Sequence, residues 1–122
     1  MLNDKLAQFA NQNYLNLETF YPDGRGVKTP VWFVEDGGKL YIRTIADSWK
    51  VKRITRNPQV RVVPSGGRGE PLGEWVDGAA VVLEDRAAIN QLLKQKYGLQ
   101  KSAFDLMGRF SSQKYVTLEV TL

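Results

Sequence analysis

Apolar and polar residues alternate in several short stretches of the chain, a period of two that is typical of β-strands with one buried face. The second stretch contains Pro30, which favours an edge position or a bulge, and the fifth contains Gly78, which favours a bulge. Asp36-Gly37-Gly38 has the composition of a hairpin turn. The predicted strands cover residues 14–21, 27–35, 40–44, 60–64, 74–83 and 115–122.

Short turns join most of these strands, so the pattern predicts a mainly β fold with short helical insertions, a six-stranded antiparallel barrel. Closing a sheet into a barrel removes its exposed edges. A barrel of this size fills with its own side chains. We therefore expect a ligand on the outer wall of the barrel or at an interface between subunits.

A helix is predicted between the third and fourth strands, where Val51 and Ile54 lie three positions apart and face the core. Asp47 or Ser48 is the expected N-cap of this helix, because short polar side chains are favoured at that position. Helical segments are predicted over residues 4–12, 48–57, 86–97 and 102–110.

The amino-acid composition excludes several kinds of active site. The 122 residues suffice for one domain, which we expect to span residues 1–122. Cysteine and histidine are absent, which excludes a disulfide framework and a Ser-His-Asp triad, and no metal site is predicted. If the protein is an enzyme, a cofactor carries the chemistry, and no side chain is assigned a catalytic role.

Charge and hydropathy suggest a location and a class of ligand. No apolar stretch approaches the roughly 18 residues of a membrane span, and the N-terminus does not resemble a signal peptide, so we expect a cytoplasmic protein. The net charge of +4 favours anionic ligands.

The cations concentrate beside one predicted helix N-terminus. Lys50, Lys52 and Arg53 lie in its first turn, and Arg43 and Thr44 end the strand before it. A helix N-terminus presents unpaired N–H groups and the positive end of a dipole, both of which suit a phosphate. This segment therefore predicts a site for a phosphate-bearing ligand on the wall of the barrel.

Three consecutive segments carry a family resemblance: TPVWFVEDGGKLYIRT, ADSWKVKRITRNPQVRVVP and PLGEWVDGAAVVLED. Together they resemble the pyridoxamine 5'-phosphate oxidase-like superfamily of flavin-binding split barrels. Within it the pattern is similar to the branch of deazaflavin (coenzyme F-420)-dependent oxidoreductases. The resemblance runs from Tyr14 to Leu122. It implies a homodimer that holds FMN or a deazaflavin at the subunit interface.

The resemblance also implies where the cofactor lies. The ring would lie along the strand segment Thr29, Pro30, Val31 and Trp32, and Trp75 and Arg109 are the residues expected to complete the pocket from the other subunit. The residues expected to hold the phosphate are Arg43, Thr44, Ser48 and Lys50, with Lys52 and Arg53 as further candidates.

Some positions depart from the pyridoxamine 5'-phosphate oxidases themselves. Phe33 replaces a lysine of the ring-side strand, Trp49 interrupts their Ser-Arg-Lys, and Gly73 stands where a glutamine meets the flavin. The sequence also ends with the last predicted strand, without a substrate-binding C-terminal segment. Pyridoxamine phosphate is therefore not the expected substrate.

The predicted activity is hydride transfer between the bound cofactor and a small organic substrate. A flavin-binding protein without turnover is one alternative, and a basic barrel that binds single-stranded nucleic acid is a less favoured one. Other residues are interpreted as features of the protein surface. Trp49 and Trp75 could be interface anchors. A solvated helix face is expected at Asp85, Arg86 and the cluster 94–96, and a flexible loop at residues 65–73.

Overall fold

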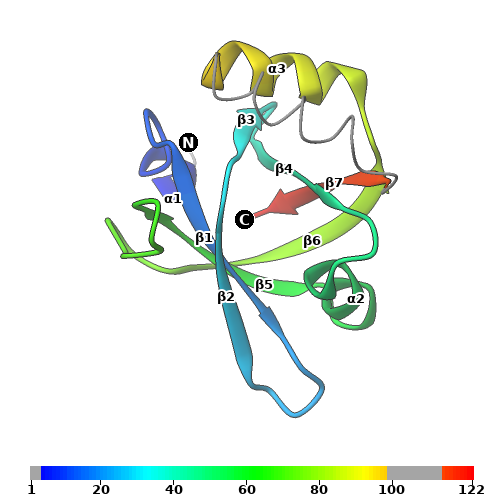
Figure 1. The fold of residues 1–122 in the computed structure, drawn as a ribbon. Helices are drawn as coiled ribbons and strands as arrows, with labels where there is room; N and C mark the ends of the chain where they lie inside the picture. Colours follow the sequence, from blue (N-terminus) through cyan, green and yellow to red (C-terminus); the bar gives the residue numbers. More distant parts are fainter. Residues whose placement is uncertain (1–3, 99–113) are drawn as a thin grey trace.

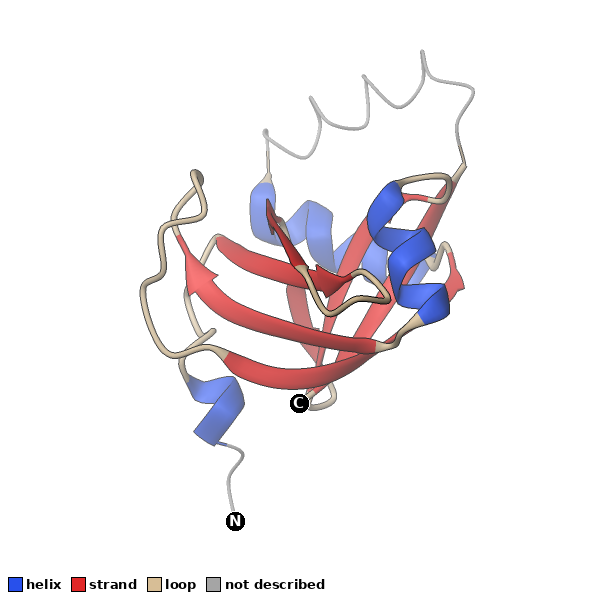
Figure 2. Ribbon diagram, turned by 90° about the horizontal axis from the view of Figure 1, so that it is seen from below, coloured by secondary structure: helices blue, strands red, loops and turns tan. Residues whose placement is uncertain are grey.

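The computed structural model describes residues 4–98 and 114–122, in which one antiparallel sheet curls around the core (Figures 1 and 2). Its strands follow the order β2-β1-β5-β6-β7-β4-β3. The described residues include three α-helices, α1 (Asp4–Ala7), α2 (Trp49–Arg56) and α3 (Ala87–Tyr97). The strands are β1 (Tyr14–Phe20), β2 (Gly26–Val31), β3 (Val34–Asp36), β4 (Lys39–Ile45), β5 (Gln59–Ser65), β6 (Val76–Glu84) and β7 (Tyr115–Thr121).

The mainly β prediction is confirmed, but the strand count and the closure of the barrel are wrong. The predicted strand 27–35 is interrupted at Trp32 and Phe33. Its first part, β2, pairs only with β1, and its second part, β3, pairs only with β4. One continuous segment thus forms both edges of a seven-stranded sheet, and no ladder of hydrogen bonds closes the circle among the described residues.

The interruption follows from the burial of Phe33, whose side chain is 1% exposed and meets the Phe9 ring edge-on at 5.9 Å. Its backbone N–H donates to the Tyr97 hydroxyl at 3.0 Å instead of to a strand. Trp32 stacks on the Tyr97 ring with 4.4 Å between centroids. Contacts with α3 therefore replace strand pairing at this point.

Pro30 lies on the edge strand β2, as predicted, whereas the predicted bulge at Gly78 is wrong. The register between β5 and β6 runs regularly through the pair Val60 and Gly78. A Cβ at position 78 would lie 2.9 Å from the Thr121 carbonyl oxygen and from Leu122 Cδ2. Glycine is required here because the chain approaches closely, without an extra residue in the strand.

Two apolar clusters hold the elements together. The larger one fills the curled sheet and includes Leu17, Ile42, Ile54 and Leu118. The smaller one joins α3 to β3 and β4 through residues such as Val34, Tyr41 and Leu93. Accordingly, α3 covers the β3 end of the sheet, and α2 lies away from α3, near β5 (Figure 1).

The helices follow the predicted positions with shorter bounds. The first ends at Ala7 instead of residue 12, and its remainder forms turns. Gly98 caps α3 with a φ of 57°. The predicted helix 102–110 lies outside the described residues. Within the described part of the chain, the structure contains no helix long and apolar enough to cross a membrane.

The Tyr97 hydroxyl gives this packing a pH dependence. It lies 2.8 Å from the Asn13 carbonyl oxygen, and burial raises the pKa of Tyr97 to about 12. Because the folded state holds this proton more tightly than the unfolded state, the stability that it contributes is complete below about pH 10 and is lost as the pH rises towards 12.

We expect Tyr97→Phe to cost about 1–3 kcal/mol at pH 7, because the buried Phe33 N–H loses its acceptor. The difference in unfolding free energy between wild type and variant should shrink between pH 10 and 12. Urea unfolding of both proteins across this interval measures it. A difference that stays constant would contradict the raised pKa of Tyr97.

Candidate functional site

Thr44, Ser48 and Lys50 form a small polar group where β4 leads into α2. Thr44 is buried near the end of β4, and the Lys50 ammonium donates to its hydroxyl at 3.1 Å. Ser48 is the N-cap residue of α2, with extended φ and ψ of −74° and 157°. We call these three residues the α2 cradle.

The Ser48 hydroxyl is the unusual member of the α2 cradle. It makes no capping hydrogen bond to the helix, and its oxygen is buried without a described hydrogen-bond partner. A buried hydroxyl without a partner is costly. The other predicted N-cap, Asp47, instead pairs with Lys52 at 3.4 Å. Ser48 therefore retains an unused donor beside the first turn of α2.

Lys50 is also in an unfavourable environment. Burial, followed by the positive charge of nearby Arg53, lowers the pKa of Lys50 below its usual range. A bound anion would reverse both effects, because it would compensate the two cations and restore polar contacts to the ammonium. The α2 cradle thus fits a phosphate group by its donors and by its charge.

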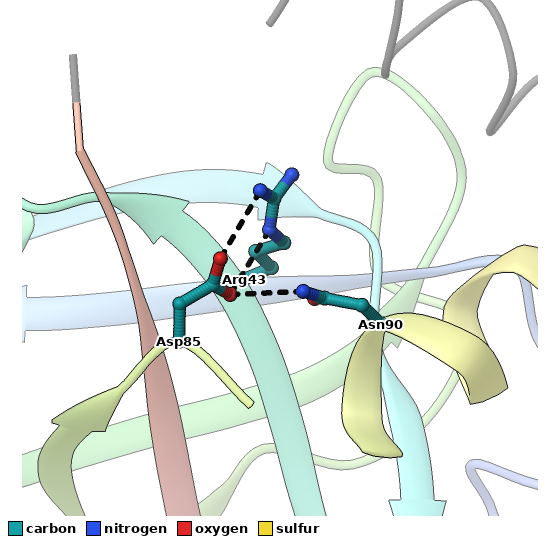
Figure 3. Close-up of polar contacts among 3 residues, drawn as sticks. All are labelled: Arg43, Asp85 and Asn90. Atoms are coloured by element: carbon teal, nitrogen blue, oxygen red, sulfur yellow. Dashed lines mark hydrogen bonds and ion pairs between the residues drawn. The ribbon is translucent and has the colours of Figure 1, made fainter. Parts of the chain in front are cut away.

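Arg43 lies on the other face of β4 and is not part of the α2 cradle. Neighbouring residues of a strand point to opposite sides, so Arg43 and Thr44 diverge. The Arg43 guanidinium makes a two-pronged ion pair with Asp85, with nitrogen to oxygen distances of 3.1 and 3.2 Å (Figure 3). Asn90 of α3 donates to the same carboxylate at 3.2 Å. As a phosphate ligand, Arg43 remains a prediction.

The described contacts of Lys52 and Arg53 do not include Thr44. Lys52 is exposed and lies over the Trp49 ring at 4.6 Å. Arg53 is buried, and its Nε donates to the Thr19 hydroxyl at 2.7 Å. Both residues remain predictions as phosphate ligands.

The predicted ring-side segment is divided by the end of β2. Thr29, Pro30 and Val31 are partly buried on this edge strand, which pairs with β1 on one side only among the described strands. Trp32 follows the strand, and its ring is stacked on Tyr97. Only the first three residues therefore present a strand edge to a ligand or a second subunit.

Trp75 lies apart from the α2 cradle, over a row of charges on β2, β1 and β5. Lys28 and Arg61 approach its ring to 5.3 and 5.0 Å. Arg61 also pairs with Glu18 at 3.1 Å. No described contact within the chain joins Trp75 to the α2 cradle, and Arg109 lies outside the described residues.

Asp85, Arg86 and residues 94–96 are exposed, in agreement with a solvated helix face, but Asp85 and Lys96 also make specific contacts that the sequence did not indicate. Asp85 anchors Arg43, and Lys96 lies over the Phe33 ring at 3.6 Å while donating to the Phe33 carbonyl at 2.8 Å. Burial lowers the pKa of Lys96 to about 8. Sequence reasoning also missed Tyr97. The only local signal was its position at the end of the apolar face of α3, which does not indicate a partner.

A strongly curved antiparallel sheet whose two edges come from one segment defines the class of split β-barrels. A family model described as pyridoxamine 5'-phosphate oxidase matches residues 2–121. The chain therefore belongs to the pyridoxamine 5'-phosphate oxidase family. No curated protein sequence matches the chain significantly.

Solved structures share the fold at low sequence identity. The heme storage protein HutZ of Vibrio cholerae is 14% identical with a TM-score of 0.70, and the match covers 98% of this chain and 89% of that one. A conserved hypothetical protein of Mycobacterium tuberculosis is 22% identical with a TM-score of 0.69, over 98% and 79% of the two chains. An F-420 reductase is 18% identical with a TM-score of 0.64, over 99% and 94%.

Proposed function

We propose that this protein binds the phosphate of FMN or of a deazaflavin in the α2 cradle and acts as an oxidoreductase on a small organic substrate. The observation that carries the proposal is the buried Ser48 hydroxyl without a described partner, beside Lys50, whose pKa is lowered by burial. Membership of the pyridoxamine 5'-phosphate oxidase family and the structural likeness to an F-420 reductase support it.

In this proposal the chain supplies binding, orientation and shielding from water. Ser48 and the free N–H groups of α2 donate to the phosphate, and Lys50 balances its charge. The edge of β2 at Thr29, Pro30 and Val31 faces the ring. When bound, the flavin or deazaflavin supplies the capacity to accept and donate hydride. Chemistry of this kind needs no side-chain nucleophile, in agreement with a chain without cysteine or histidine.

We further propose a homodimer in which the cofactor lies between the subunits. The support is the outer edge of β2, which has no strand partner among the described residues, so that its peptide groups are available to a second copy. Trp75 and Arg109 remain the residues proposed to reach the site from the other subunit.

The likeness to a heme storage protein suggests a second kind of cofactor. This chain contains neither histidine nor cysteine, two of the common protein ligands of haem iron. The α2 cradle instead consists of donors suited to a phosphate. Flavin binding is therefore the function that these side chains support better.

Titration with FMN, with coenzyme F-420 and with riboflavin tests the proposal. We expect a change in absorbance or fluorescence at micromolar concentrations of at least one phosphorylated cofactor. Riboflavin lacks the phosphate and should bind about tenfold or more weakly than FMN, because it loses the charge-assisted contacts of the α2 cradle.

Two results would count against the proposal. Equal affinities for FMN and riboflavin would show that the protein does not bind the phosphate. The absence of a spectral change with both FMN and F-420 would show that it binds neither cofactor. Light scattering on the same samples should give twice the chain mass of 13.8 kDa. A monomer that still binds FMN would show that the site does not need a second subunit.

A further inference from the structure

A cavity lies beside α2, between this helix and the turn that follows β1. Its volume is about 130 Å³. The residues that line it include Tyr21, Pro22, Trp49, Lys52, Arg53 and Arg56. The three cations recur at helical spacing on one face of α2, and none of the described residues that line the cavity is acidic. We call this space the hairpin cavity.

Arg53 is the central feature of the hairpin cavity because it is 9% exposed and has no carboxylate partner among the described residues. Its Nε donates to the Thr19 hydroxyl at 2.7 Å, and its guanidinium carbon lies 5.4 Å from the centre of the Tyr21 ring. No described acceptor contacts its two terminal nitrogens. A buried charge is normally paired, since an uncompensated one is costly.

A nearby cation adds to the uncompensated positive charge of Arg53. Lys50, on the side of the α2 cradle, is close enough to Arg53 for its own pKa to be lowered. Asp47 pairs with Lys52 at 3.4 Å, and Asp23 pairs with Arg25 at 2.8 Å. Among the described residues, Arg53 and Arg56 are therefore the cations of the cavity that have no carboxylate partner.

The walls restrict which anion fits. Tyr21 and Trp49 supply aromatic surface, and Trp49 is 71% exposed, so a ligand in the cavity would cover part of its ring. The planar fork of an arginine matches both oxygens of a carboxylate. Charge and wall chemistry together favour a carboxylate on a compact ring or aliphatic body.

We propose that the hairpin cavity binds a small organic carboxylate, with its carboxylate on Arg53 and its apolar body between Tyr21 and Trp49. This site is separate from the α2 cradle, whose polar groups are Thr44, Ser48 and Lys50. It would give the protein a binding site for a carboxylic acid substrate or effector. The proposal does not depend on flavin binding.

Calorimetric titration of the whole chain with benzoate tests this site, with benzamide and acetate as matched ligands. Benzamide keeps the ring without the charge, and acetate keeps the charge without the ring. We expect each to bind at least about tenfold more weakly than benzoate, and inorganic phosphate to bind more weakly as well. The exposed Trp49 should report benzoate binding by a change in its fluorescence.

Arg53→Gln should lower benzoate affinity at least about tenfold, whereas Arg68→Gln, an exposed arginine of the 66–69 turn, should leave it unchanged. If Arg53→Gln does not fold, Trp49→Ala serves instead, since this side chain is mostly exposed and its loss should weaken benzoate about threefold or more.

Equal binding of benzoate and benzamide would overturn the proposal, as would an unchanged affinity in both Arg53→Gln and Trp49→Ala. Displacement of benzoate by FMN would assign the cavity to the flavin site and overturn its separate role. Failure of FMN to bind would affect only the proposed function, because the benzoate titration needs no cofactor.

Discussion

Lys50→Met is expected to weaken FMN binding by about tenfold to a hundredfold. A hydrogen bond to a charged group contributes about 1.5–3 kcal/mol, and about 1.4 kcal/mol corresponds to a tenfold change in affinity. Lys50 is the cation that contacts Thr44, at 3.1 Å, beside the buried Ser48 hydroxyl. Fluorescence titration of wild type and variant with FMN measures the change.

The protein offers a matched control in Lys94. This lysine is exposed in the last turn of α3 and is not among the predicted phosphate ligands. Lys94→Met should change FMN affinity at most about threefold, and neither variant should alter the weaker affinity for riboflavin. Equal losses in the two variants would show that general positive charge, and not the α2 cradle, attracts the cofactor.

The stability of Lys50→Met should not fall. In the folded protein without ligand, burial and Arg53 both disfavour the Lys50 ammonium and lower its pKa. Removal of a charge that the fold holds at a cost leaves the free energy of unfolding unchanged or slightly higher. Weaker FMN binding together with retained stability would therefore locate the effect in the site.

Phe33→Ala is expected to lower the free energy of unfolding by about 3–5 kcal/mol, the usual cost of truncating a buried phenylalanine. Phe33 is among the largest fully buried side chains in the described part of the chain, and its ring contacts Phe9 and Lys96. Small domains have unfolding free energies of about 5–15 kcal/mol. A loss of this size would remove a large share of the stability.

Urea unfolding followed by circular dichroism measures this effect. Leu72→Ala is the matched control, because Leu72 is 58% exposed and its truncation should cost less than about 0.5 kcal/mol. A small loss in Phe33→Ala would mean that the break between β2 and β3 does not depend on the burial of this ring.

Much of the sheet could be predicted because strands and tight turns have characteristic local sequence patterns. The strand from Tyr14 to Phe20 and the turn Asp36-Gly37-Gly38 appear in the structure close to their predicted places, although the middle of β1 is buried on both faces. The break at Trp32 and Phe33 could not be predicted. Both residues favour strands, and the break depends on Tyr97, which is 64 residues from Phe33 along the chain.

The candidate site was predictable to a similar degree. Ser48 and Lys50 follow from the helix start and the cations that surround it. The separation of Arg43 from Thr44 also follows from the strand period, but the face that would meet a ligand depends on where Asp85 and α3 pack. That packing is a tertiary contact between residues 42 positions apart.

Local patterns in the sequence predict most of the strands, the hairpin turn and a cationic helix after β4. Which cation contacts which partner depends on the tertiary packing. Arg43 is anchored to Asp85, Arg53 turns to Thr19, and Lys50 remains beside Thr44. The pairings of Arg43 and Arg53 could not be predicted because the partners are far apart along the chain. Hydrophobic periodicity records the face on which a side chain lies, whereas the partner across 34 or 42 residues depends on how the curled sheet brings separate strands together.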